Sequence, residues 1–319
     1  MYTPLALQHG GYEVRLITFQ ALTKVYAKGK VPAIDDATFE VNDGETVGFV
    51  GLNGAGKTTT IKIAAGVLLP TAGTVAIDGH DIVKDKVAAS KASGWVPEFP
   101  NFDMGTRASS LMKYYAGFYK LGSSTDARCT EVFNAVGLKG SEGKKLKEYS
   151  QGMKKRFSLG VSLLSNPHNV LFDEVLNGLD PEGIAYFRQL VLDYKKDGKA
   201  VFFSSHLLSE VEALADKIVV VHKGKIIKVL QRQELAVVGG EAMRIVIANM
   251  GDKAVAYLKT LGQVAVDGNV AVVKGYSGEP MAASMELTKM GFTVSEFARV
   301  NESLEEYFFK LIGKDGGGA

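Results

Sequence analysis

Gly51-Leu52-Asn53-Gly54-Ala55-Gly56-Lys57-Thr58 is the stretch of sequence that decides the fold. It matches the phosphate-binding pattern G-x-x-x-x-G-K-[ST], and the apolar run 46–50 directly before it predicts a strand. Glycines let consecutive backbone N–H groups converge on one phosphate, and a helix from residue 59 would direct its positive end at the same anion. The stretch therefore predicts a nucleotide-binding loop between a strand and a helix.

Two further groups of polar residues follow apolar, strand-like runs. Asp173 and Glu174 stand after the run 169–172, and His206 follows the run 201–205. Ligand sites in α/β proteins form at the carboxyl ends of the strands, so we expect these residues near the loop. Asp173 would then hold Mg²⁺, Glu174 would polarise a water toward the γ-phosphate, and His206 would reach a γ-phosphate oxygen.

The rest of the chain shows an α/β pattern that predicts a mostly parallel sheet. From about 99 to 164 helical segments replace the strands, among them 109–120 with an apolar face of Leu111, Tyr114, Tyr115 and Phe118. After Gly239-Gly240 the pattern predicts a small α+β module. The expected domains are an N-terminal extension at 1–14, an ATPase domain at 15–238 with a helical subdomain at about 99–164, an accessory α+β domain at 241–313, and a disordered tail at 314–319.

Composition narrows the functional classes. In 319 residues, 46% hydrophobic and 23% charged side chains indicate an ordinary globular protein, and a net charge of +2 is far from that of a general nucleic-acid binder. The single cysteine, Cys129, permits no internal disulfide and fits a reducing compartment. No apolar run approaches the roughly 20 residues that a transmembrane helix needs. Residues 1–14 do not read as a secretory signal, so we expect a cytoplasmic protein.

With these elements in order, the sequence over about 15–230 resembles the nucleotide-binding subunits of ATP-binding cassette (ABC) transporters. Tyr26 stands where that family has the aromatic residue that stacks on adenine. Tyr149-Ser150-Gln151-Gly152-Met153 occupies the place of the family's signature motif, usually Leu-Ser-Gly-Gly-Gln, and Leu179-Asp180 matches its dimer-facing D-loop. The module that ends the chain resembles, more weakly, the accessory domain of many export-type subunits.

The resemblance implies a P-loop NTPase cassette with ATP and Mg²⁺ as cofactors. It implies ATP hydrolysis in a head-to-tail dimer with a second ATPase subunit, identical or different, that drives a separate transmembrane permease from the cytoplasmic face of the cell membrane, with export favoured. In that dimer Ser150, Gln151 and Gly152 would complete the ATP site of the opposite subunit, and Asp180 would face it. The residues expected at the nucleotide are Tyr26, Asn53, Gly54, Ala55, Gly56, Lys57, Thr58 and Thr59; those at the metal are Thr58, Asp173 and Glu98; those expected to be catalytic are Glu174 and His206.

Departures from the family pattern and two alternatives remain at this point. Glu98 stands where the family usually has glutamine; a carboxylate can still ligate the metal, but its charge changes the local balance. A soluble ABC-type ATPase acting on nucleic acid or the ribosome usually carries two cassettes or long coiled coils, which this chain lacks, so no nucleic-acid partner is expected. A P-loop kinase or GTPase predicts no Ser150-Gln151-Gly152 element and gives no reason for His206.

Overall fold

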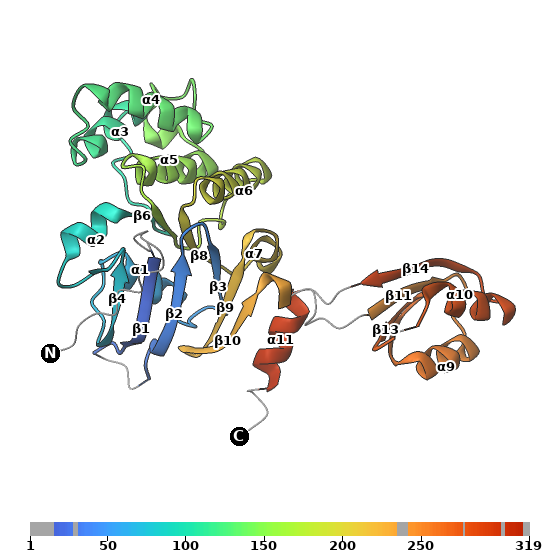
Figure 1. The fold of residues 1–319 in the computed structure, drawn as a ribbon. Helices are drawn as coiled ribbons and strands as arrows, with labels where there is room; N and C mark the ends of the chain where they lie inside the picture. The colour runs from blue at the N-terminus through green and yellow to red at the C-terminus, as the bar shows by residue number, and fades with distance from the viewer. Residues whose placement is uncertain (1–15, 28–30, 235–241, 277, 301–303, 315–319) are drawn as a thin grey trace. The chain divides into compact units, whose positions relative to one another are not determined.

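The computed structural model describes residues 16–27, 31–234, 242–276, 278–300 and 304–314. The chain forms two compact units, Met1–Val229 and Leu230–Ala319 (Figure 1). The predicted extension at 1–14, the predicted domain boundaries at 238 and 241, and most of the predicted tail lie outside the described residues. The extents of the two predicted domains therefore stay predictions.

A six-stranded sheet in the order β10-β9-β3-β8-β7-β6 forms the centre of the first unit. Pairing is parallel from β9 through β3, β8 and β7 to β6. Every residue of β3, β7 and β8 is buried, which explains their continuous runs of apolar residues. The predicted α/β fold with a mostly parallel sheet is confirmed. The strands are β3 (Thr46–Val50), β6 (Ser93–Val96), β7 (Asn169–Phe172), β8 (Ala200–Ser205), β9 (Lys217–His222) and β10 (Lys225–Gln231).

A second sheet in this unit is antiparallel, in the order β2-β1-β4-β5. Phe39 on this sheet stacks on Phe19, with 4.1 Å between ring centroids, and on Phe49 of the central sheet at 5.5 Å. Ile61 and Ile63 of α1 (Lys57–Ala64) belong to the same buried cluster, so one core joins both sheets and this helix. The strands are β1 (Leu16–Lys24), β2 (Ile34–Asn42), β4 (Ala72–Ile77) and β5 (His80–Asp81).

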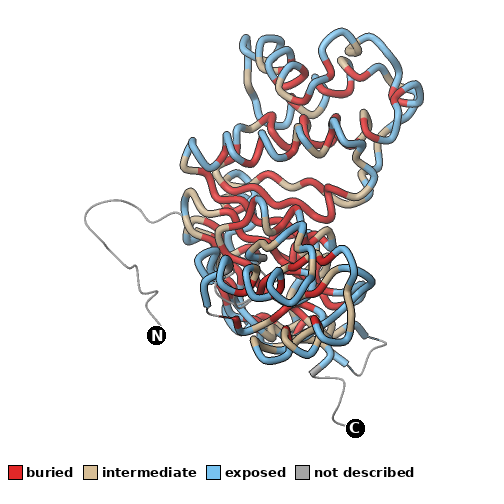
Figure 2. Tube along the Cα trace, turned by 90° about the vertical axis from the view of Figure 1, so that its right-hand side faces the viewer, coloured by how far each residue is buried: buried red, intermediate tan, exposed pale blue. Residues whose placement is uncertain are grey.

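Helices replace strands between β6 and β7, as predicted, and α3, α4 and α5 form a layer at one end of the sheets (Figure 1). Figure 2 shows buried residues running through the strands and along the inner sides of these helices. The predicted apolar face of α3 is partly wrong: Leu111 is buried, but Tyr114 and Phe118 are 62% and 67% exposed. Met112 and Ala116 are buried instead, so the inward face is rotated around the helix. The helices of this unit are α2 (Lys86–Ala92), α3 (Ala108–Gly117), α4 (Thr125–Ala135), α5 (Gln151–Leu163), α6 (Pro181–Lys196) and α7 (Leu208–Leu214).

The second unit is an antiparallel sheet in the order β12-β13-β11-β14 with helices α9 and α10. Its core gathers residues such as Ile245, Leu258, Val273 and Leu287. This agrees with the predicted α+β character of the module. Its elements are β11 (Ala242–Ile247), α9 (Asp252–Leu261), β12 (Gln263–Asp267), β13 (Val270–Lys274), α10 (Pro280–Lys289), β14 (Val294–Val300) and α11 (Leu304–Lys314).

Within the part of the chain that the structure describes, no helix combines the length and apolar character that crossing a membrane requires.

Candidate nucleotide site

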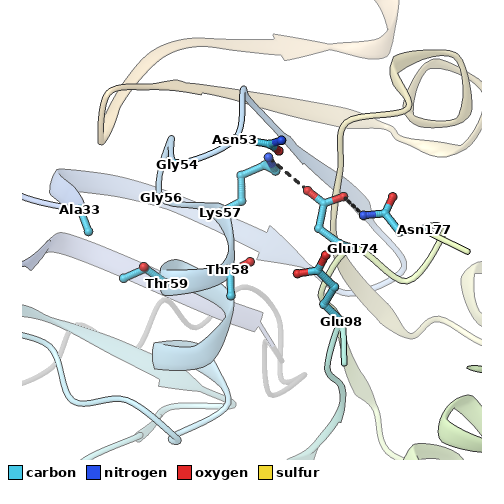
Figure 3. A pocket seen from close by; sticks show the side chains of 10 residues that line it. All are labelled: Ala33, Asn53, Gly54, Gly56, Lys57, Thr58, Thr59, Glu98, Glu174 and Asn177. Carbon is cyan, nitrogen blue, oxygen red and sulfur yellow. Dashed lines mark hydrogen bonds and ion pairs between the residues drawn. The ribbon is translucent and has the colours of Figure 1, made fainter. Parts of the chain in front are cut away.

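A cavity of about 510 Å³ lies beside the loop that follows β3 and the segment that follows β7 (Figure 3). Its volume is within the range of roughly 300–1,000 Å³ that is usual for small-molecule sites. Both segments leave the carboxyl ends of parallel strands, where α/β proteins bind their ligands. The cavity is lined by Ala33, Asn53, Gly54, Gly56, Lys57, Thr58, Thr59, Glu98, Glu174 and Asn177.

The loop before α1 depends on a glycine at position 56. Gly56 has φ 111°, in a region that L side chains rarely adopt, and an added Cβ would lie 2.3 Å from the carbonyl oxygen of Ala33. Only glycine therefore fits at position 56. Helix α1 begins directly after it at Lys57, two residues earlier than predicted. Ala55 does not line the cavity; its backbone N–H donates to Leu52 and its carbonyl accepts from Gly224.

Lys57 and Glu174 form a buried ion pair in the cavity wall (Figure 3). The distance from Lys57 Nζ to Glu174 Oε1 is 3.1 Å, and both side chains are at least 94% buried, with 5% and 6% exposed. Lys57 Nζ also donates to the carbonyl oxygens of Gly51 at 2.7 Å and Leu52 at 3.3 Å. These carbonyl oxygens and the Glu174 carboxylate compensate the positive charge of Lys57, which would be costly to bury without partners.

The second oxygen of Glu174 has two partners of its own. His206 Nδ1 lies 3.1 Å from Glu174 Oε2, and Asn177 Nδ2 donates to the same atom at 3.3 Å. The predicted neighbours Glu174 and His206 are therefore in contact; Glu174 comes from the segment after β7, and His206 directly follows β8. Asn177 is a residue that the sequence analysis missed, and only its position three residues after Glu174 could have indicated it.

Asp173 accepts two hydrogen bonds on one oxygen and none on the other. Thr58 Oγ1 at 3.0 Å and Ser204 Oγ at 3.1 Å both donate to Asp173 Oδ1. Asp173 Oδ2 is buried and has no hydrogen-bond partner among the described residues. Burial raises the pKa of Asp173 above its ordinary value, although the two hydroxyl groups oppose this. Ser204, which also accepts from the N–H of Glu174 at 2.9 Å, was not predicted.

Tyr26 and Glu98 stand at the edges of the site. Tyr26 is 46% exposed, and its hydroxyl lies 3.2 Å from Thr59 Oγ1, which places its ring beside the start of α1. Glu98 comes from the segment after β6, and its carboxylate points toward Thr58 and Glu174 in Figure 3. Glu98 therefore lines the cavity, whereas Tyr26 does not line it but contacts Thr59, which does.

The predicted signature residues lie elsewhere in the unit. Ser150 and Gln151 are exposed, and Ser150 Oγ caps α5 by accepting from the N–H of Met153 at 3.2 Å. Asp180 caps α6, and a Cβ added to Gly152 would lie 3.4 Å from its carboxylate. Ser150, Gly152 and Asp180 are therefore close to one another, but they are not among the residues that line the cavity of their own chain.

A family model for ABC transporters matches residues 34–177 of this chain. The bacitracin transport ATP-binding protein BcrA of Bacillus licheniformis is 32% identical over 298 residues, which cover 92% of this chain and 95% of BcrA. An uncharacterized ABC transporter ATP-binding protein of Synechocystis sp. is 30% identical, and the match covers 98% of this chain and 90% of the relative. These matches leave the nucleic-acid, kinase and GTPase alternatives without support.

Solved structures agree at the level of the fold. An ATP-binding subunit of an ABC transporter superposes with a TM-score of 0.64 at 26% identity, over 69% of this chain and 91% of that one. A dimeric ATP-binding cassette in a post-hydrolysis state, bound to ADP and Pi, superposes with a TM-score of 0.63 at 22% identity, over 68% of this chain and 98% of that one. The protein belongs to the ABC transporter family as an ATP-binding subunit, and it is an ATPase.

Proposed function

We propose that this ATPase binds MgATP in the cavity of Figure 3 and hydrolyses it in a head-to-tail dimer that drives a separate transmembrane permease. The observation that carries the proposal is the chain of contacts from Lys57 through Glu174 to His206. It joins a cation suited to phosphate, a carboxylate suited to accept a proton from water, and an imidazole suited to a phosphate oxygen.

Lys57 takes the β- and γ-phosphates in this proposal, with the loop 51–56 around them and Tyr26 under the adenine. Its ammonium group now donates to Gly51 and Leu52 and pairs with Glu174. Phosphate oxygens would compete for the same donors. Once Lys57 turns to phosphate, the Glu174 carboxylate keeps His206 and Asn177 and gains one oxygen free to receive a proton from water.

The donors around Asp173 fit a hard divalent cation. Asp173 Oδ2 is buried without a partner among the described residues, and the Thr58 hydroxyl and the Glu98 carboxylate face the same region. Oxygen donors of this kind are those that Mg²⁺ takes in nucleotide sites, together with substrate phosphates. We assign Mg²⁺ to Thr58 and Asp173, with Glu98 as the third ligand; when bound, it neutralises charge on the phosphates.

A second subunit completes the site in this proposal. Ser150 and Gln151 are exposed and do not line their own chain's cavity, so a role at ATP requires a second chain, identical or different. The similar cassette bound to ADP and Pi is dimeric. Asp180, at the start of α6 beside Gly152, would lie in the same interface.

Export is the direction we assign, on the cytoplasmic face of the cell membrane. BcrA is named for bacitracin transport, and its likeness covers 92% of this chain, more than a cassette alone would occupy. The second unit, which we assign as the accessory domain at 241–313 after an ATPase domain at 15–238, supports an export-type subunit by resemblance. The membrane-spanning part of the transporter would then be a separate chain.

ATPase activity per milligram should be measured across a dilution series with saturating MgATP. A shared site predicts that specific activity rises with protein concentration until dimers saturate, and light scattering on the same samples reports the dimer. Ser150→Arg should abolish this rise while ATP binding persists, because Ser150 does not line its own cavity. Constant specific activity from a protein that stays monomeric would contradict the shared site.

A further inference from the structure

Lys155 is a buried lysine beside the nucleotide site that the assigned roles leave unused. It lies in the second turn of α5, five residues after Ser150, and it is only 7% exposed. Its Nζ donates to the carbonyl oxygen of Glu98, in the segment after β6 that lines the cavity. A lysine at this depth needs compensation, because an unpaired buried ammonium is costly.

Three nearby carboxylates compensate the buried positive charge of Lys155. Burial lowers the pKa of Lys155, while the carboxylates of Glu98, Asp173 and Glu174 act to raise it, in that order. Lys57 is a second buried cation at the cavity, and it is paired with Glu174. When Lys57 turns to phosphate, as proposed above, Lys155 is the cation that stays with the carboxylates.

Glu98 adds a negative charge to a place where negative phosphates must also enter. The Glu98 and Glu174 carboxylates both line the cavity (Figure 3), and Asp173 directly precedes Glu174 in the chain. The phosphate end of a nucleotide would lie beside these carboxylates. A like charge at about 8 Å, at an effective dielectric constant of 20–60, disfavours an incoming anion by a factor of roughly three to thirty. A site with this extra carboxylate therefore needs an extra cation to bind ATP with ordinary affinity.

We propose that Lys155 is a positioning residue for the nucleotide site: it anchors the main chain of the 97–99 segment and offsets the charge of Glu98. The inference rests on the proposed function of the cavity. Glu98 and Lys155 then form a charge-balanced pair, equivalent in net charge to two neutral residues. A change at one member should shift the binding of anionic nucleotide in one direction, and a change at the other should shift it in the opposite direction.

The experiment measures ATP binding by calorimetry in excess EDTA, so that no metal takes part. Lys155→Gln should weaken metal-free ATP binding roughly three- to tenfold, and Glu98→Gln should strengthen it by a similar factor. The double variant Glu98→Gln/Lys155→Gln should return to within about twofold of the parent, because the net charge is restored. Lys155→Arg should keep most of the parental affinity, because the cation and its donors remain.

Lys154→Gln is the matched control, because it makes the same change of net charge one residue away on the same helix, at a partly exposed position. It should leave metal-free ATP affinity near the parental value. Thermal unfolding of each variant separates stability from charge. A purely structural lysine predicts that Lys155→Gln lowers the melting temperature and that the double variant is not restored.

Two results would overturn the pairing: unchanged or weaker ATP binding in Glu98→Gln, or a double variant that binds as weakly as Lys155→Gln. The first can be obtained even if Lys155→Gln fails to fold, because Glu98→Gln keeps the anchoring lysine. A different result would show that the cavity does not bind ATP: Lys57→Ala would then bind ATP as the parent does, whatever the Glu98 and Lys155 variants show.

Discussion

The two units of this protein differ in what they bury. In the first unit, charged side chains such as Lys57, Lys155, Asp173 and Glu174 lie in the interior. In the second unit, no buried charged side chain occurs among the described residues, and the core is made of residues such as Ile245 and Leu258. Burying a charged group costs free energy unless the group is paired. Several buried charged groups in one unit therefore indicate a functional site.

This difference indicates that the catalytic residues lie in the first unit. Lys57 pairs with Glu174, which also contacts His206. Ser204 accepts from the Glu174 N–H and donates to Asp173, which also accepts from Thr58. The described residues of the second unit include no buried charged side chain from which a comparable buried network could form. Changes to the first unit's buried charges should therefore alter catalysis and binding, whereas changes to the second unit's core should alter only its own stability.

The largest expected effect comes from the carboxylate that both Lys57 and His206 contact. Glu174→Gln should reduce phosphate release at saturating ATP about 100- to 10,000-fold, because an amide cannot accept the proton of the attacking water. ATP affinity should stay near the parental value. Glu131→Gln removes an exposed carboxylate that pairs with Arg128 on α4, and it should leave turnover unchanged. Parental turnover in Glu174→Gln would remove the basis for assigning the buried charges to chemistry.

The next effect concerns the second unit alone. Leu258→Ala, at a fully buried position of α9, should lower the free energy of unfolding of that unit by roughly 2–5 kcal/mol. Hydrogen exchange in the intact chain, followed separately over residues of each unit, measures the change. ATP affinity should not move. Val266→Ala, at a residue 43% exposed on β12, should cost less than about 0.5 kcal/mol. A loss of ATP binding in Leu258→Ala would mean that the units are coupled.

Lys57→Ala should weaken ATP binding about ten- to a hundredfold, since hydrogen bonds to charged groups are worth roughly 1.5–3 kcal/mol. Binding is measured by calorimetry on the non-hydrolysing background of Glu174→Gln. Lys62→Ala is the control, because it removes a lysine from the last turn of the same helix without touching the cavity lining. Equal losses in both variants would indicate a general effect of positive charge rather than a phosphate contact.

The smallest expected effect is at the exposed edge of the site. Tyr26→Ala should weaken ATP binding by about 1–2 kcal/mol, the usual value of a lost stacking platform. Tyr26→Phe keeps the ring and loses only the contact with Thr59, so it should bind nearly as the parent does. A loss that is equal in both variants would locate the contribution in the hydroxyl and contradict stacking.

Local sequence patterns predicted much of the fold. The loop 51–58 with its strand, the strands 169–172 and 200–205, and most elements of the second unit follow from short-range patterns of apolar and turn residues. Short-range sequence patterns do not show that β1 and β4 belong to a separate antiparallel sheet, because strand pairing depends on contacts between distant residues. It also missed the rotation of α3, since a ten-residue helix with apolar residues on several sides has no single preferred face.

The candidate site was predicted to the same extent and for the same reason. Lys57, Thr58, Asp173, Glu174 and His206 were found because each follows a strand-like run, and the structure places them in one network. The partners that complete the network lack such a pattern: Ser204 reaches Asp173 across 31 residues, and Lys155 reaches Glu98 across 57. The sequence around a serine in a strand or a lysine in a helix does not indicate which distant residue the side chain will contact in the fold. The roles assigned to these residues stay predictions.

Gly56 has a consequence for mutational scanning of this protein. Gly54 has φ 80° and no atom within 4 Å of an added Cβ, so a substitution there strains the backbone without a clash inside the chain. At Gly56 the same strain comes with a carbonyl oxygen 2.3 Å away, and that carbonyl belongs to Ala33, next to the antiparallel sheet. Loss of function on substituting Gly56 would therefore reflect the close approach of two chain segments. It would not show that Gly56 contacts the ligand, as loss of function at Lys57 would.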